Sequence, residues 1–276
     1  MNGVERIAIL GGGNLGSAIA RGLAASGDLR PEHIAVTRRT AGHLLGLQHE
    51  GFRTTRDNLA AVKHSDVVLV CVQPQHLDAL LGEIAPALEA SSQVVISTVS
   101  GASIAAMRQH LGPKIPLIRA MPNLGISIGE SMTCLAADES SLSALPLARQ
   151  IFDGVGTSLV IREDQMSPAT ALCACGIAFF LRAIRAASQG GIEIGFHADE
   201  AIRLAAQTAK GAAALLLAHG SHPEAEIDKV TTPEGCTIIG LNEMESRGFS
   251  SAMVRGIVSS ARKAAQLYQP EASGRG

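Results

Sequence analysis

The chain lacks features that several common classes of protein require. It has no tryptophan, a single tyrosine and a formal net charge of −2 over 276 residues. Nucleic-acid-binding proteins carry a basic surface, and those that bind single strands add aromatic side chains for base stacking. We therefore expect no nucleic-acid partner.

A long apolar run and a leader are also lacking. The longest uncharged apolar run, Ala171–Leu181, is shorter than the roughly 20 residues that a helix needs to cross a bilayer. No charged segment followed by an apolar stretch precedes the first strand-like run. We therefore expect a soluble, cytoplasmic protein without a membrane partner.

Cysteine is scarce as well. The five cysteines are odd in number and scattered through apolar stretches, which suits a reducing compartment better than a disulfide framework. Two of them lie two residues apart on a predicted helix and point in different directions, and no second pair of Cys or His completes a metal site. We expect buried free thiols and no metal at Cys71, Cys134, Cys173, Cys175 and Cys236.

A glycine cluster lies ten residues into the chain, where a strand-like run meets a helical pattern. In a dinucleotide-binding turn, Gly11 permits the tight turn, Gly13 lets the backbone approach the phosphates, and Gly16 allows close packing of helix on strand. The helix that begins near Asn14 directs free N–H groups at the pyrophosphate. The alternative is a turn that serves packing only. We predict a cofactor site at Gly11, Gly13, Asn14, Leu15 and Gly16.

An acidic residue is lacking at the end of the second predicted strand, where NAD-binding proteins place one on the ribose hydroxyls. The strand instead runs into Arg38, Arg39 and Thr40. Two guanidinium groups and a hydroxyl can bind a 2′-phosphate through charge-assisted hydrogen bonds. The pattern therefore favours NADP over NAD. The alternative is that the two arginines are ordinary solvated cations.

Strand-like and helical segments alternate from residue 6 to about 161. This alternation predicts right-handed βαβ units, and hence an α/β fold whose Rossmann domain, residues 1–162, has a doubly wound, mostly parallel sheet. The run Val67–Val72 is apolar at every position, as in a central strand buried on both faces. The eight predicted strands are Arg6–Leu10, Ile34–Thr37, Phe52–Thr54, Val67–Val72, Gln93–Thr98, Ile115–Ala120, Met132–Ala136 and Ser158–Ile161.

After residue 162 the strand-like runs stop, and an all-α dimerisation domain is predicted over 163–276. Residues 171–181 are apolar all round the predicted helix, so they need a cover that a small helical domain cannot supply. A second copy of the chain is the natural supplier, and we expect a homodimer. The predicted helices are 164–190, 198–219, 234–247 and 250–268, followed by a polar tail from Pro270 to Gly276.

Unusual turns follow several predicted strands, at the edge where open α/β sheets bind ligands. They are Val72-Gln73-Pro74-Gln75, Val99-Ser100-Gly101 and Arg119-Ala120-Met121-Pro122-Asn123. Asn58 follows the third strand, and its amide suits an adenine edge. In the alternative interpretation the prolines only stop strands and Asn58 caps a helix. We predict cofactor contacts from Asn58, Val72, Gln73 and Pro74.

A threonine-rich turn leads into an apolar helix in the second half of the chain. Its sequence is Val230-Thr231-Thr232-Pro233-Glu234-Gly235-Cys236-Thr237. Hydroxyls and unpaired first-turn N–H groups can bind a small carboxylate. The alternative is that Thr232 is a helix N-cap with Pro233 in the first helical position.

In these motifs the chain resembles pyrroline-5-carboxylate reductases, from residue 6 to about 268. The threonine-rich turn is the most specific part, because many dehydrogenases share the glycine fingerprint. The resemblance implies NADPH-dependent reduction of a cyclic imino acid, 1-pyrroline-5-carboxylate, to L-proline in proline biosynthesis. It also implies a helical domain that interlocks with its twin in a dimer, sometimes assembled further into a ring.

The resemblance implies residue roles as well. Thr237 is the catalytic residue, which hydrogen-bonds the imine nitrogen. Thr232 and the N–H groups around Gly235 and Cys236 hold the substrate carboxylate. The implied substrate-binding set is Met121, Asn123, Thr232, Pro233, Glu234, Gly235 and Cys236.

The chain departs from the family pattern at four places. It has Gln73 for Lys, Leu124-Gly125 for Thr-Pro, and Cys173–Phe179 for the segment Ser-Gly-Ser-Gly-Pro-Ala-Tyr. Glu234 stands where the family has Gly and puts a carboxylate beside the loop expected to hold the substrate carboxylate. Either Glu234 points to solvent or the substrate differs.

Two other functions share these features. A β-hydroxyacid dehydrogenase has the same two-domain plan but needs a lysine as general acid/base on the long helix after the Rossmann domain. No lysine lies between residues 164 and 209. A catalytically silent protein would bind NADP without turnover, and Gln73 and the substituted segment 173–179 favour it.

Overall fold

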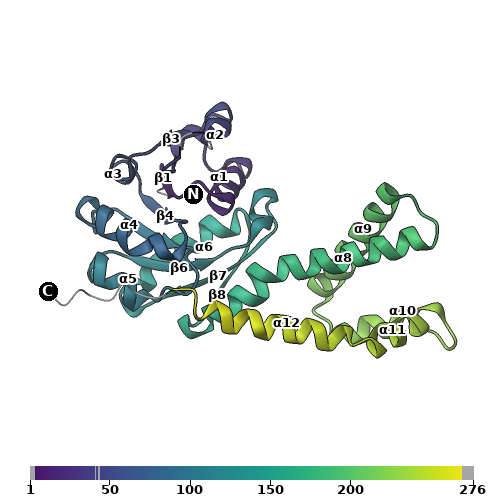
Figure 1. Ribbon diagram of the computed structural model, residues 1–276. Coiled ribbons are helices and arrows are strands. Elements are labelled where there is room, and N and C mark those ends of the chain that lie inside the picture. The colour runs from purple at the N-terminus through teal and green to yellow at the C-terminus, as the bar shows by residue number, and fades with distance from the viewer. Residues whose placement is uncertain (1–3, 41, 43, 269–276) are drawn as a thin grey trace. The chain divides into compact units, whose positions relative to one another are not determined.

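The computed structural model describes residues 4–40, 42 and 44–268 and divides into two compact units. Unit 1 comprises Met1–Cys175 and Val258–Gly276, and unit 2 comprises Gly176–Ile257. Figure 1 shows strands only in unit 1 and helices throughout unit 2. By this division residues 163–175 belong with the sheet, because Met166 and Ala169 pack in a buried cluster with Met121 and Cys134.

Unit 1 contains an eight-stranded sheet in the order β3-β2-β1-β4-β5-β6-β7-β8. Neighbouring strands run parallel except for the β6–β7 pair. β4 lies between β1 and β5 and is fully buried, as its apolar sequence predicts. All eight predicted strands are confirmed, β2 at its predicted bounds and the others with ends within two residues of the prediction. They are β1 (Ile7–Leu10), β2 (Ile34–Thr37), β3 (Arg53–Thr55), β4 (Val67–Val70), β5 (Val94–Ser97), β6 (Leu117–Met121), β7 (Ser131–Ala137) and β8 (Gly156–Val160).

Helices cover both faces of this sheet, as alternate residues of β1 show. Ile7 and Ile9 pack in one buried cluster with residues of α1 and α6, whereas Ala8 and Leu10 pack in another with residues of α3, α4 and α5. This is the predicted doubly wound arrangement. The helices are α1 (Asn14–Ala25), α2 (Leu45–His49), α3 (Asn58–Val62), α4 (Leu77–Ile84), α5 (Ile104–Leu111), α6 (Leu145–Asp153) and α7 (Met166–Ala169).

Short helical turns join these elements. The 3₁₀ turns are η1 (Pro31–His33), η3 (Pro74–His76), η4 (Ala85–Ala87), η5 (Leu124–Ile128), η6 (Glu139–Ala144) and η7 (Glu163–Gln165), and η8 (Thr170–Cys175) is a π-helical turn.

Unit 2 is helical, with one helix at its predicted bounds and one that was not predicted. The predicted helix over 164–190 runs through η7, α7 and η8 before it becomes α8. The unpredicted helix, α10, begins at a proline and carries acidic residues in its first turn, so its eight residues lack an apolar period. The polar tail from Pro270 lies outside the described residues. The helices are α8 (Gly176–Glu193), α9 (Ala198–His219), α10 (Pro223–Val230), α11 (Cys236–Ser246) and α12 (Phe249–Ala264), which ends in unit 1.

Unit 2 buries little of its apolar surface within one chain. Among its described residues, Ala201 is the one buried apolar side chain, whereas Phe180 is 60% exposed and Leu217 is 88% exposed. The helical stretch Glu163–Glu193 is long and apolar enough, by length and composition, to cross a membrane. The sequence criterion, an uninterrupted apolar run, missed this stretch because isolated charges divide it. A helix covered by a second copy of the chain passes the same test.

Candidate functional site

The glycine turn between β1 and α1 has the geometry that its sequence predicts. Gly11 has a φ of +114°, and a Cβ there would lie 2.5 Å from the carbonyl oxygen of Cys71. A Cβ on Gly16 would clash with the carbonyl oxygen of Gly11, whereas one on Gly13 would meet no atom within 4 Å. Gly11 and Gly16 are therefore required by the close approach of backbone, and Gly13 faces open space.

The N-terminus of α1 has no competing partner at this turn. Its N-cap, Gly13, provides no side-chain cap, and no acidic residue lies in the first turn. The unpaired N–H groups and the positive end of the helix dipole are therefore available to an anion such as a pyrophosphate.

The turn opens into a pocket of about 410 Å³ at the carboxyl ends of β1, β2, β3 and β4. Four of the predicted cofactor residues, Asn14, Leu15, Gly16 and Pro74, do not line it. Seven do, namely Gly11, Gly13, Arg38, Arg39, Asn58, Val72 and Gln73.

Cationic groups gather at the β2 side of this pocket. Arg38 Nη1 donates a hydrogen bond of 2.8 Å to the carbonyl oxygen of Gly12, and Arg39 Nη2 lies 2.9 Å from His76 Nε2. Arg56 also lines the pocket, although sequence reasoning did not select it. The signal was available: Arg56 follows β3, which pairs in parallel with β2. The ends of parallel neighbouring strands lie at one edge of a sheet.

Hydrogen bonds to both the oxygen and the nitrogen of the Asn58 amide fix the orientation of this side chain. Its Oδ1 accepts a hydrogen bond of 2.6 Å from Thr37 Oγ1, and its Nδ2 lies 3.2 Å from both oxygens of Glu83. The cap of α3 is Asp57, which accepts from the Ala60 N–H at 2.9 Å. The alternative interpretation of Asn58 as a helix cap is therefore wrong.

The turn after β6 carries Met121 and Asn123, the two predicted substrate residues of unit 1. Met121 is buried. Asn123 Oδ1 accepts from the Gly125 N–H at 2.9 Å, and its Nδ2 donates to the carbonyl oxygen of Cys173 at 3.3 Å. The Asn123 amide therefore links the turn after β6 to η8 by a hydrogen bond.

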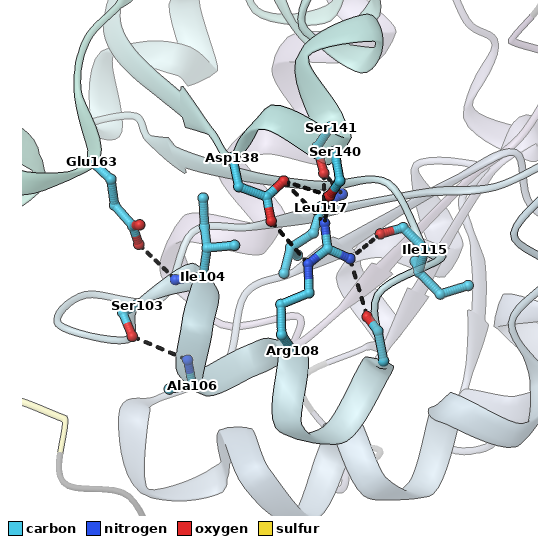
Figure 2. A network of polar contacts seen from close by, with 11 residues as sticks. Ser103, Ile104, Ala106, Arg108, Ile115, Leu117, Asp138, Ser140, Ser141 and Glu163 are labelled. Carbon is cyan, nitrogen blue, oxygen red and sulfur yellow. Dashed lines mark hydrogen bonds and ion pairs between the residues drawn. The ribbon is translucent and has the colours of Figure 1, made fainter.

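A buried ion pair fixes the strand that leads into this turn. Arg119 on β6 is 6% exposed, and its Nη1 lies 3.1 Å from Glu163 Oε1. The same oxygen accepts from the Ile104 N–H at 2.6 Å, as Figure 2 shows. Burial lowers the pKa of the Arg119 guanidinium, and the hydrogen bond with Glu163 opposes this effect. Glu163 thereby ties β6 and the start of α5 together.

A second polar network holds the far end of α5 (Figure 2). Arg108 Nε and Nη2 lie 3.0 and 3.1 Å from the two carboxylate oxygens of Asp138, and Nη2 also donates to Ser140 and Ser141. Burial raises the pKa of Asp138, but hydrogen bonds led by Arg108 outweigh it and hold that pKa at about 2. The carboxylate is therefore ionised at neutral pH.

The threonine-rich turn of unit 2 joins α10 to α11. The N-cap of α11 is Gly235 and provides no side-chain cap, so Thr232 is not the N-cap and Pro233 does not open the helix. Thr237 is the second residue of α11 and is exposed. Of the five cysteines expected to be buried, only Cys134 is, since Cys236 is exposed and Cys71, Cys173 and Cys175 are half-buried. Among the described residues, no side chain caps the N-terminus of α11, and Thr237 is exposed beside its first-turn N–H groups.

Glu234 has the left-handed conformation that favours glycine. Its φ is +58°, and among the described residues it alone has a positive φ without being glycine. The conformation follows from the tight turn, in which the Gly235 N–H donates to the Thr232 carbonyl oxygen at 2.9 Å. Glu234 is exposed in the chain.

The fold and the pocket define the class of protein as a Rossmann-type oxidoreductase. Residues 6–101 match the family described as NADP oxidoreductase, coenzyme F420-dependent. Residues 163–267 match the family described as pyrroline-5-carboxylate reductase dimerisation.

Relatives identify the family. Pyrroline-5-carboxylate reductase 2 of Dictyostelium discoideum is 47% identical over 95% of this chain and 93% of its own length. Pyrroline-5-carboxylate reductase 1 of the same organism is 54% identical over 95% of this chain, which spans about half, 50%, of that longer protein. The chain therefore belongs to the pyrroline-5-carboxylate reductase family, as the resemblance implied.

Solved structures agree. A pyrroline-5-carboxylate reductase of Coxiella burnetii has a TM-score of 0.84 at 28% identity, covering 96% of this chain and 99% of its own. A pyrroline carboxylate reductase of Plasmodium falciparum with NADP bound has a TM-score of 0.85 at 22% identity, covering 96% and 98%, and shows the shared fold. Membership of this family rules against the β-hydroxyacid dehydrogenase.

Proposed function

We propose that this chain reduces 1-pyrroline-5-carboxylate to L-proline, with NADPH as hydride donor, in proline biosynthesis. The observation that carries the proposal is that one chain of this family holds both a glycine turn that opens into a pocket of about 410 Å³ and the threonine-rich turn. The test is NADPH oxidation against cyclic imino acids with five- and six-membered rings. We expect the five-membered ring to be preferred; turnover of the six-membered ring alone would contradict the proposal.

The reaction needs no strong acid or base on the protein. When bound, NADPH supplies the hydride for the imine carbon, and a cyclic imine is basic enough to gain its proton near neutral pH. The chain must therefore chiefly hold the imine in a productive orientation, which can lower a barrier by roughly 7 to 11 kcal/mol at best.

We propose that the threonine-rich turn performs this orientation. The exposed Thr237 hydroxyl would hydrogen-bond the imine nitrogen. Thr232 and the N–H groups of Gly235 and Cys236 would hold the carboxylate, because an uncapped helix N-terminus attracts anions. The absence of a side-chain cap on α11 supports this role. Pro233, Glu234, Met121 and Asn123 complete the proposed substrate-binding set.

We also propose that the enzyme prefers NADPH to NADH. Arg38, Arg39 and Arg56 line the β2 side of the pocket, and Glu83, which also lines it, is engaged by the Asn58 amide. A 2′-phosphate at this side would meet cationic donors. The 2′-hydroxyl of NADH at this position would leave the three arginines without an anionic partner.

The domains and assembly complete the proposal. Residues 1–162 would form the NADP-binding domain, and residues 163–276 the substrate-binding and dimerisation domain. The exposed apolar side chains of unit 2 support a homodimer, and rings of such dimers are the proposed higher assembly. We propose a soluble cytoplasmic enzyme with a small imino acid as substrate and without a nucleic-acid or membrane partner.

A further inference from the structure

Two of the five cysteines lie next to each other in unit 1. Cys134 lies on β7 and Cys173 in the π-helical turn η8, and their sulfur atoms are 3.9 Å apart. A disulfide needs about 2.05 Å. The sulfur atoms therefore need to approach by only about 2 Å to form a bond.

The pair is built into the cluster that supports the turn after β6. Cys134 is 4% exposed and is buried together with Met121 and Met166, and Cys173 packs against the same cluster. The carbonyl oxygen of Cys173 accepts the amide hydrogen bond from Asn123. A change at the sulfur atoms would therefore reach both predicted substrate residues of this turn.

The two thiols differ in pKa and in exposure. The hydrogen bond with Cys134 lowers the pKa of the Cys173 thiol to about 7, although burial opposes this effect. The same bond raises the pKa of Cys134. Cys173 is also the more exposed of the two. Because the thiolate is the nucleophile in thiol chemistry, Cys173 would react first and Cys134 second.

We propose that Cys134 and Cys173 form a reversible disulfide that displaces the Met121–Asn123 turn and slows the enzyme. The oxidant is hydrogen peroxide. The Cys173 thiolate attacks the outer peroxide oxygen, the O–O bond breaks, and hydroxide leaves, which gives Cys173 sulfenic acid. The Cys134 sulfur then attacks the Cys173 sulfur, the S–O bond breaks, and water leaves. In sum, two thiols and one peroxide give one disulfide and two waters.

The π-helical turn is the side that must move. β7 is paired on both sides, with β6 and with β8, so its backbone is fixed by two ladders. The turn η8 has π-helical geometry, which is rare and less regular than an α-helix. Closing the bond would draw Cys173 toward β7, and its carbonyl would carry the hydrogen bond to Asn123 with it.

The bond itself is independent of the proposed function, whereas its effect on turnover rests on that function. The purified protein is therefore treated with hydrogen peroxide and followed in two ways. Peptide mapping by mass spectrometry under non-reducing conditions detects the 134–173 crosslink. Hydrogen exchange of residues 121–131 and 170–175 detects displacement of the turn without any need for activity.

We expect a crosslink between residues 134 and 173, faster exchange at residues 121–125, and at least about a fivefold loss of imine reduction, which corresponds to about 1 kcal/mol in barrier. Dithiothreitol should reverse all three. Cys134→Ser and Cys173→Ser should each abolish the crosslink and the reversible loss. Cys175→Ser is the matched control two residues along the same turn and should still crosslink.

Three results would overturn the proposal. They are peroxide treatment that leaves both thiols free, a crosslink that changes neither exchange nor turnover, and a reversible loss that persists in Cys173→Ser. Melting curves of the variants confirm that each is folded. If the untreated protein reduces no imine, the proposed function fails, and the crosslink with its exchange signature still decides the inference.

Discussion

Arg38 donates a hydrogen bond from Nη1 to the carbonyl oxygen of Gly12, 2.8 Å away. This contact ties the end of β2 to the glycine turn that precedes α1. Arg39, the next residue, extends instead to His76 on η3. Both arginines line the pocket, but only Arg38 also supports the glycine turn.

The first prediction separates these tasks by cofactor binding. Arg39→Ala should weaken NADPH binding by about 1.5–3 kcal/mol, as for one lost charge-assisted hydrogen bond, and leave NADH binding unchanged. Arg38→Ala should weaken binding of both cofactors because the glycine turn loses its support, and of NADPH more than NADH because the pocket also loses a cation. Dissociation constants from fluorescence titration test this. Arg53→Ala on the exposed part of β3 is the control, and equal losses for both cofactors in Arg39→Ala would contradict phosphate recognition.

The second prediction concerns the left-handed conformation of Glu234. Glu234→Gly should stabilise the protein by about 1 kcal/mol because glycine adopts this conformation without a Cβ penalty. Glu234→Gln keeps the Cβ and removes the charge. If the carboxylate repels the substrate carboxylate, both variants should lower KM, whereas only Glu234→Gly should raise Tm. An unchanged KM in both would show that Glu234 points away from the substrate.

The third prediction is a pH dependence of stability at the Arg108–Asp138 pair. The folded pKa of Asp138, about 2, lies below its usual value of 3.8, so the ionised form stabilises the fold above about pH 4. This stabilisation is lost as the pH falls toward 2. Because the Asp138 side chain is 32% exposed, solvent screening reduces the contribution of this carboxylate to the free energy of unfolding to about 1–2 kcal/mol.

Denaturant unfolding at several pH values tests this. Asp138→Asn should lower the free energy of unfolding at pH 7 and should differ less from the parent protein near pH 2. Asp164→Asn removes a fully exposed ion pair with Arg162 and is the control. A constant difference between Asp138→Asn and the parent protein at all pH values would contradict the assigned pKa.

Strands and the glycine turn could be predicted because their signals are local. A run such as Val67–Val70 is apolar at each position, and only a strand buried on both faces explains it. In the glycine turn, Gly11 has a φ of +114°, and a Cβ on Gly16 would clash with the carbonyl oxygen of Gly11 in the same turn. These features depend on a few neighbouring residues and are therefore visible in the sequence.

Other parts of the site depend on pairing between distant segments. Arg56 and His76 reach the pocket through the parallel order of β3, β2, β1 and β4, which composition does not reveal. The facing of Cys134 and Cys173 depends on where η8 packs on β7. The helix α10 was missed because its polar sequence has no apolar period.

The fourth prediction concerns the dimer. Phe180→Asp should cause aggregation or loss of the dimer, because Phe180 is 60% exposed in one chain and obligate interfaces resemble a divided core. Gln189→Asp introduces the same charge at an exposed polar position of the same helix and should remain dimeric. Size-exclusion chromatography with light scattering measures both. A folded, soluble monomer of Phe180→Asp at micromolar concentration would contradict the prediction.

The last prediction concerns Thr237, the side chain proposed to lie nearest the reacting nitrogen. Because the N-cap of α11 is Gly235, removing the Thr237 hydroxyl removes no helix cap. Thr237→Val should lower kcat by roughly 5- to 150-fold, or about 1–3 kcal/mol, with little change in Tm, and Thr237→Ser should retain most activity.

Thr231→Val is the matched control for this test. The Thr231 hydroxyl donates to the Ile227 carbonyl oxygen at 2.8 Å, so its loss should affect Tm rather than kcat. A hydroxyl that binds the imine more strongly in the transition state must act on kcat. Unchanged turnover in Thr237→Val would remove this residue from the mechanism and leave orientation by the backbone N–H groups of α11 as the surviving account.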